Sequence, residues 1–154
     1  MRHTALLLAA FVAVGCVRTS TNPATGKIDV DVESPSKTGE DWTAKLAGMG
    51  SFAHLTGESK VLVNQGSSSA TISLMGGMSG ARHPWHVHEG KCGTGGPIVG
   101  NPSAYAPLVV SSDGRATASA DLTVALDEAY DYHVNVHESS ANMANIIACG
   151  NLDD

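Results

Sequence analysis

A strict two-residue alternation between residues 116 and 126 is the feature that most constrains the fold. Apolar side chains occupy every second position there, and most of the positions between them are small and polar. Successive side chains of a β-strand point to opposite faces, so this pattern predicts a strand with one buried and one solvated face. The Ser111–Gly114 segment directly before it has the composition of a hairpin turn.

Shorter alternating segments recur along the rest of the chain, at 44–46, 60–64, 70–74, 85–88 and 130–137. No stretch shows the 3.6-residue apolar stripe of an amphipathic helix. Charged residues make up only 16% of the 154 residues and aromatic residues 5%, which favours a turn-rich β domain over a helix bundle. We therefore expect one all-β domain, a sandwich or a barrel.

The N-terminus has the features of an export signal. Arg2 precedes a short apolar run, residues 5–14, which is too short to span a bilayer. Small residues then lead to Cys16, which resembles the end of a bacterial lipoprotein signal. We expect a signal peptide at 1–15, lipidation of Cys16, and a protein exported to the bacterial cell envelope, membrane-anchored by its lipid or periplasmic. The alternative is an ordinary secretory signal with an incidental Cys16.

The segment that follows, residues 16–41, is expected to be a flexible linker because it is polar and rich in helix and strand breakers. Only residues 28–32 alternate within it, and they could form an isolated edge strand. The β domain is expected to span residues 42–154. The formal net charge of −6, without any cluster of Lys or Arg, excludes nucleic acid as a partner. Nothing in the sequence indicates the oligomeric state.

The chain has three cysteines, an odd number for an exported protein. Lipidation of Cys16 would use one of them, and Cys92 and Cys149 could then pair in an oxidising compartment. The alternative is that Cys92 and Cys149 are two unrelated buried thiols.

Three histidines have the strand parity of a metal site. His86 and His88 would project to one face of a strand, opposite Trp85 and Val87, and His137 would lie on the polar face of the last alternating segment. Imidazole ligands without thiolates or clustered carboxylates suit copper or zinc. On spacing alone, three unconnected surface histidines are an equal alternative.

The other histidines, aromatic residues and glutamates near these motifs are expected to have no part in a metal site. We expect the remaining histidines of the β domain to lie on the surface, the large aromatic residues of the two histidine segments to face the core, and the glutamates after the motifs to be loop carboxylates. These are, respectively, His54, His83 and His133; Trp85, Tyr130 and Tyr132; and Glu89 and Glu138.

The order of the motifs resembles the copper/zinc superoxide dismutase family. His-Val-His-Glu-Gly at 86–90 is followed by Cys92, Gly-Gly-Pro, Asn-Pro, then Val-His-Glu at 136–138 and Ala-Cys-Gly at 148–150. The similarity covers about residues 43 to 152. It implies an eight-stranded Greek-key β-barrel with copper ligands at His86, His88 and His137. It also implies a disulfide between Cys92 and Cys149.

The chain departs from that family pattern in its zinc site and its anion-guiding elements. Ile98 stands where the histidine that bridges copper and zinc should be, and no histidine or carboxylate lies between Cys92 and Asp113, so zinc is not expected. Ile146 replaces the expected active-site arginine. We therefore expect one copper ion per chain and a copper-only site that dismutates superoxide weakly. The alternatives are a non-catalytic copper-binding or copper-buffering protein and a structural domain without metal.

Overall fold

A computed structural model describes residues 17–21, 28–32 and 39–153 of the chain, in two compact units, Met1–Pro35 and Ser36–Asp154. The predicted signal peptide at 1–15 and the predicted lipidation site Cys16 lie outside the described residues. The first unit contains one antiparallel pair, β1 (Val17–Thr21) and β2 (Ile28–Val32), which falls within the range expected to be a linker.

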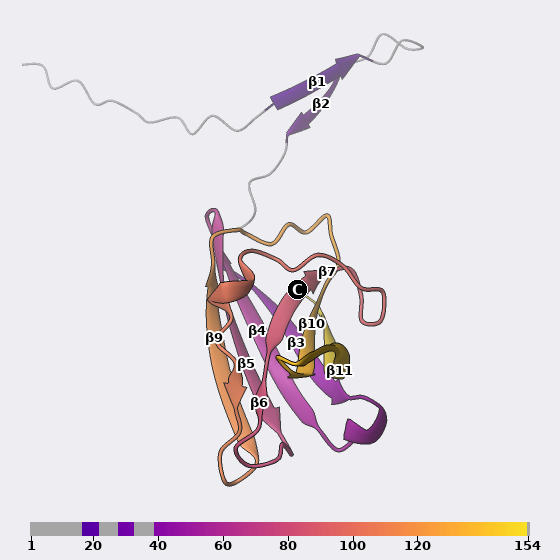
Figure 1. Cartoon of the computed structure of the whole chain (residues 1–154). Helices are drawn as coiled ribbons and strands as arrows, with labels where there is room; N and C mark the ends of the chain where they lie inside the picture. The colour runs from indigo at the N-terminus through magenta and orange to yellow at the C-terminus, as the bar shows by residue number, and fades with distance from the viewer. Residues whose placement is uncertain (1–16, 22–27, 33–38, 154) are drawn as a thin grey trace, which may run out of the picture. The chain divides into compact units, whose positions relative to one another are not determined.

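The second unit is built on one seven-stranded antiparallel sheet (Figure 1). Its strands follow the order β7-β10-β11-β3-β4-β5-β9. Their bounds are β3 (Glu40–Gly48), β4 (Thr56–Asn64), β5 (Ser67–Met75), β7 (Trp85–Glu89), β9 (Arg115–Leu122), β10 (Tyr132–Ser139) and β11 (Asn142–Leu152). The remaining elements are the short strands β6 (Arg82–His83) and β8 (Leu108–Val109) and the 3₁₀ turns η1 (Gly50–Phe52) and η2 (Pro102–Ala104).

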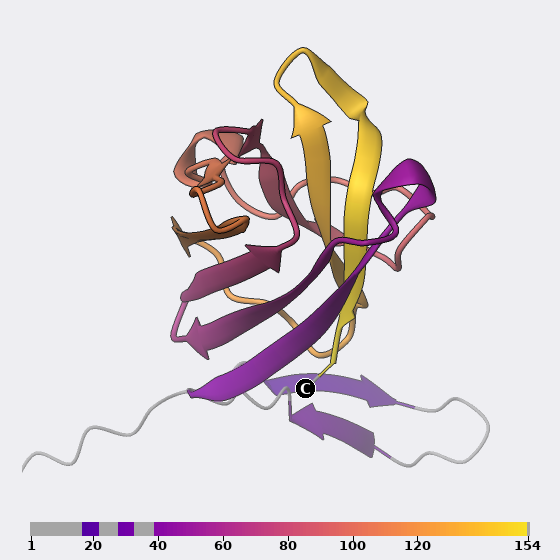
Figure 2. The ribbon, with the colours of Figure 1, turned by 90° about the horizontal axis from the view of Figure 1, so that it is seen from below.

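The sheet curls into a half-barrel around the core, which confirms the all-β prediction (Figure 2). The predicted alternation holds in β9, where Ala116, Ala120 and Leu122 are buried, and it ends with the strand at Leu122. The predicted turn before it is also present, because the Gly114 amide donates to the Ser111 carbonyl. Among the described residues, no helix is long and apolar enough to cross a membrane.

The inner faces of β7 and β10 form the part of the core that lies behind the histidines. Trp85 and Val87 of β7 are fully buried, and the Trp85 indole N–H donates to the Ala106 carbonyl at 2.7 Å. Tyr132 is buried as predicted, and its ring packs edge-on against Trp42. The prediction for Tyr130 is wrong: its side chain is 58% exposed, because β10 begins only at Tyr132 and Tyr130 lies in the preceding turn.

A small second sheet connects the two edge strands of the large one. β6 pairs with β8, with Arg82 opposite Val109 and His83 opposite Leu108. Pro84 separates β6 from β7, since it has no N–H to donate to a ladder. β6 leads into edge strand β7, and β8 leads through the Ser111–Gly114 turn into edge strand β9. The β6–β8 pairing therefore links the two edges of the large sheet.

Candidate metal centre

The structure brings His86, His88 and His137 together on adjacent strands. The nitrogen atoms that they offer all lie within 4.8 Å of one another. The predicted parity is confirmed, because these rings lie on the face of β7 and β10 opposite Trp85 and Val87. This face is nevertheless covered: the exposed fractions of the three histidines are 6%, 9% and 5%, so they form a buried group rather than a surface site.

The register between β7 and β10 explains how residues 51 positions apart in sequence meet. Asn135 is the direct partner of His86, so His137, two residues further along β10, is its diagonal neighbour on the same face. The β10–β11 pairing shifts register on both sides of His137. Such bulges change the direction of a side chain, and here the bulge accompanies the approach of the His137 ring to His86.

Two of the three rings have their tautomer set by backbone carbonyls. His88 Nδ1 lies 2.9 Å from the Gly96 carbonyl oxygen, and His137 Nδ1 lies 2.6 Å from that of Met143. A carbonyl can only accept, so both Nδ1 atoms carry the hydrogen and both Nε2 atoms keep a free lone pair. A hydrogen bond of this kind on the second nitrogen is the usual support of a metal-binding histidine.

Within the described residues, these two Nε2 atoms have no hydrogen-bond partner outside the three histidines. His88 Nε2 is buried without any hydrogen bond, and such an atom costs about 1–3 kcal/mol. His137 Nε2 faces His86 Nδ1 at 3.2 Å. In the metal-free protein His86 Nδ1 therefore donates to His137 Nε2. Once that hydrogen is moved to the other nitrogen of His86, a cation would be held by His86 Nδ1, His88 Nε2 and His137 Nε2, so the residues present fit a metal ion.

The electrostatics keep His86 and His137 in the neutral form that binds metals. Burial, and then the proximity of His137 and His88, lowers the pKa of His86 to about 4. The pKa of His137 is also lowered, mainly by burial. His86 and His137 are therefore neutral imidazoles at neutral pH, so a metal ion would not have to compete with an imidazolium charge on either ring.

Tyr105, which the sequence did not single out, contacts the site from the loop before β8. Its ring packs edge-on against both Trp85 and His86, with centroid distances of 5.0 and 5.1 Å. Its hydroxyl donates to the Val99 carbonyl at 2.7 Å, and burial raises its pKa to about 12. A lone tyrosine in a loop rich in Gly and Pro gave no signal that could have marked it.

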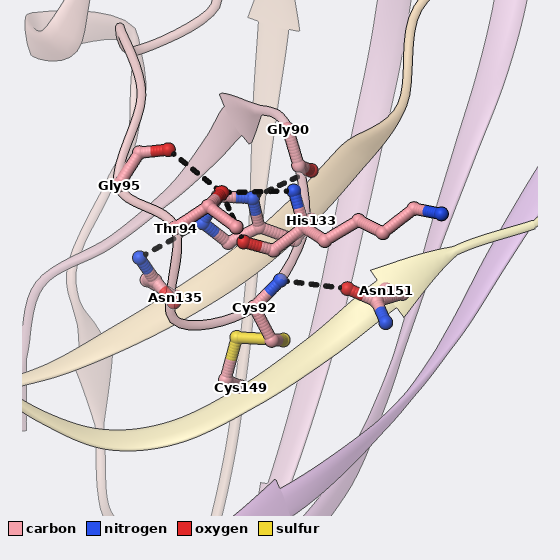
Figure 3. Close-up of a disulfide and its surroundings, with 9 residues drawn as sticks. Gly90, Cys92, Thr94, Gly95, His133, Asn135, Cys149 and Asn151 are labelled. Atoms are coloured by element: carbon pink, nitrogen blue, oxygen red, sulfur yellow. Dashed lines mark hydrogen bonds between the residues drawn. A yellow bond between two sulfur atoms is a disulfide. The ribbon is translucent and has the colours of Figure 1, made fainter.

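The predicted disulfide between Cys92 and Cys149 is present and anchors the loop that follows β7 to β11 (Figure 3). The Cys92 amide also donates to the Asn151 side chain at 2.8 Å. The Thr94 hydroxyl closes the loop on itself through the Lys91 and Gly95 carbonyls. This loop supplies Gly96, whose carbonyl sets the His88 tautomer, so the disulfide and the metal centre share one segment.

The predictions for the other histidines have mixed outcomes. His54 is exposed, as expected. His83 is buried, because it belongs to β6 and its Nδ1 binds the Glu138 carbonyl. His133 is fully buried on β10, because the disulfide-anchored loop covers that face of the strand. The prediction that His83 and His133 lie on the surface is therefore wrong.

The positions where the chain departs from the family pattern lie beside the centre. Ile98 forms an isolated bridge with His88, and Ile146 is the direct partner of His137 across β10 and β11. Glu138 lies in strand β10 rather than in a loop, and its carboxylate accepts from Asn142 and Asn145 of β11. Within the described residues, the three histidines are the one such cluster of His, Cys, Asp or Glu close enough to hold a metal ion.

Comparison with known proteins adds no relative: no family model matches the chain, and no curated protein is similar enough to be significant. The interpretation of the centre therefore depends on its own geometry and on the order of its motifs.

Proposed function

We propose that this protein binds one copper ion through His86, His88 and His137 and is a copper-only, superoxide dismutase-like protein. The observation that carries the proposal is the convergence of three imidazole nitrogens, one of them buried and without any partner among the described residues. Imidazole sites of this kind suit copper and zinc. Copper is preferred because the motif order resembles a family whose copper ligands fall on these three residues.

The arrangement of the strands supports a barrel of the superoxide dismutase type. β7 and β9 are the edge strands of the half-barrel, and the strands that lead into them, β6 and β8, pair with each other. This pairing closes the gap between the two edges. The Cys92–Cys149 disulfide lies where the resemblance puts it. We accordingly propose an eight-stranded Greek-key barrel with the centre on the outer side of β7 and β10.

When bound, copper would supply one-electron chemistry, taking an electron from one superoxide to give O₂ and passing it to a second, which takes up two protons to give H₂O₂. The protein's residues hold the nitrogens in place and leave each of the three rings at most 9% exposed to solvent. Ile146 beside His137 offers no charge to attract superoxide, and the net charge of −6 opposes an anion. We expect turnover to be slow and its protons to come from solvent.

The same observations favour a second candidate, a protein that holds copper without catalysis. His88 Nε2 is inaccessible to solvent, and the three rings are at most 9% exposed. A closed, uncharged site would bind copper tightly and exchange it slowly. Superoxide would then be the partner only in the first candidate, whereas copper is the partner in both.

The disulfide also supports the proposal that the protein works outside the cytoplasm, since disulfides persist in oxidising compartments. Cys16 is the third cysteine of the chain, and we propose that it is lipidated and anchors the chain at the envelope membrane. Mass spectrometry of the protein from the membrane fraction would test this, because a signal peptidase should cleave the Gly15–Cys16 bond and remove residues 1–15, while Cys16 gains acyl chains. A mature chain that keeps those residues would contradict it.

Copper titration followed by electron paramagnetic resonance tests the proposal. One equivalent of Cu(II) should bind with a spectrum of nitrogen coordination, and His137→Ala should lower the affinity by about 10-fold or more, because it removes one of three ligands. His54→Ala is the matched control, since it removes an exposed histidine outside the centre. Equal affinity in the two variants would eliminate the site. Superoxide consumption above that of free copper would separate the two candidates.

A further inference from the structure

His133 is the one fully buried histidine of the described residues, and the proposed copper site does not use it as a ligand. It is the direct cross-strand partner of His88 in the β7–β10 pairing. We propose that His133, oriented by Asn135, is a positioning residue that fixes the ring plane and tautomer of His88. This inference rests on the proposed metal site for its consequence, but its structural part holds in the metal-free protein.

The hydrogen bonds of His133 assign both of its nitrogens. Nδ1 lies 2.8 Å from the Gly90 carbonyl oxygen and must therefore donate. Nε2 is then the acceptor, and the Asn135 side-chain amide donates to it at 3.2 Å. With both nitrogens occupied, His133 has no lone pair to offer a metal, which distinguishes it from His86, His88 and His137.

The ring of His133 is stacked on the ring of His88. Their centroids are 5.3 Å apart and their planes differ by 19°, whereas His86 and His137 meet His88 at 82° and 59°. A nearly parallel ring limits rotation of His88 about its side-chain torsions without competing for its nitrogen. His88 Nε2 is thereby held toward the other two ligands while its face is covered.

The two stacked histidines also hold the two ends of one loop. His133 donates to Gly90 at the start of the loop (Figure 3). His88 donates to Gly96 near its end. Between them, Cys92 ties the loop to β11, where Asn151, the strand partner of His133, accepts from the Cys92 amide. Because the loop is fixed at Gly90, the Gly96 carbonyl is presented to His88 in one position.

Asn135 lies between a proposed ligand and the disulfide in the sheet. Its strand partners are His86 on β7 and Cys149 on β11, and it is buried. Its amide leaves His133 only the tautomer that donates to Gly90. Thus a chain of contacts runs from Asn135 through His133 and the loop to His88.

The test uses the full chain with His133→Leu, which removes the ring and both hydrogen bonds, and His133→Phe, which keeps a ring for stacking. The matched control is Val134→Ala, which makes a cavity on the opposite, core-facing side of the same strand without contacting His88. Two quantities are measured: the His88 tautomer in the metal-free protein, from nitrogen-15 chemical shifts of labelled histidine, and copper affinity by competition with a chelator.

We expect wild type and Val134→Ala to show His88 protonated at Nδ1 alone. His133→Leu should mix the two His88 tautomers and lower copper affinity by about 10-fold or more, the usual effect of losing support behind a ligand. His133→Phe should give a tautomer ratio and a copper affinity between those of wild type and His133→Leu. If either folded His133 variant matches Val134→Ala in both quantities, the inference is wrong. A wild type that binds no copper would refute the proposed function, while the tautomer measurement would still decide this inference.

Discussion

Removing the Cys92–Cys149 disulfide should destabilise the second unit strongly. The bridge closes a loop with a sequence separation of 57, and in the chain-entropy model such a cross-link stabilises the fold by about 4 kcal/mol. For a unit of this size, 1 kcal/mol corresponds to roughly 3–5 °C in the midpoint of thermal unfolding. The double variant Cys92→Ala/Cys149→Ala should therefore unfold roughly 12–20 °C below the oxidised wild type.

The assay is thermal unfolding followed by circular dichroism, with and without reductant. Wild type under reductant retains both sulfur atoms and loses only the cross-link, so it separates the entropic effect from the loss of buried Cys149 side-chain packing. The double variant should be insensitive to reductant. A wild type whose midpoint falls by less than about 3 °C on complete reduction would refute the reasoning, because the loop closure would then contribute under 1 kcal/mol.

Two further predictions concern pH and one glycine. The pKa of His86 is about 4 in the folded protein and ordinarily 6.5. Between these pH values the unfolded chain is protonated at His86 and the folded chain is not, so protonation favours unfolding. The free energy of unfolding should therefore fall by up to about 3 kcal/mol as the pH is lowered from 6.5 to 4. Denaturant unfolding across that range should show a shallower loss in His86→Phe, and an unchanged slope would contradict the assignment. Gly96→Ala should cost about 2 kcal/mol or more beyond Gly93→Ala. A Cβ at Gly96 would lie 2.0 Å from the Glu89 carbonyl oxygen, whereas Gly93, which also has a positive φ, has open space. Equal unfolding free energies in these two variants would show that the loop after β7 can move away.

The strand pattern was predictable because period-two alternation is a local property. The alternation correctly predicted which residues of β9 are buried. It also predicted that Trp85 and His86 lie on opposite faces of β7. The approach of His137 to His86 was not derivable from alternation, since it depends on the register of β10 against β7; only the motif order indicated it.

The errors at His133 and Tyr130 arise because parity tells which face of a strand a residue would occupy, but neither what covers that face nor where the strand ends. His133 has the polar parity, yet the loop anchored by Cys92 buries it completely. Tyr130 shows the opposite failure, because its alternation with Tyr132 continues into a turn that is no longer strand. Burial by a loop depends on long-range closure, and a single sequence carries little trace of it.

The acceptors that orient His88 and His137 are main-chain oxygens, those of Gly96 and Met143. A carbonyl is supplied by whatever amino acid occupies the position, so the identity of residue 143 is unimportant to the orientation of His137. The centre can therefore tolerate extensive sequence drift in its hairpin while its ligands stay in place. Mutational scanning should find residue 143 permissive and residue 96 restrictive, because only the latter is also confined by its neighbours.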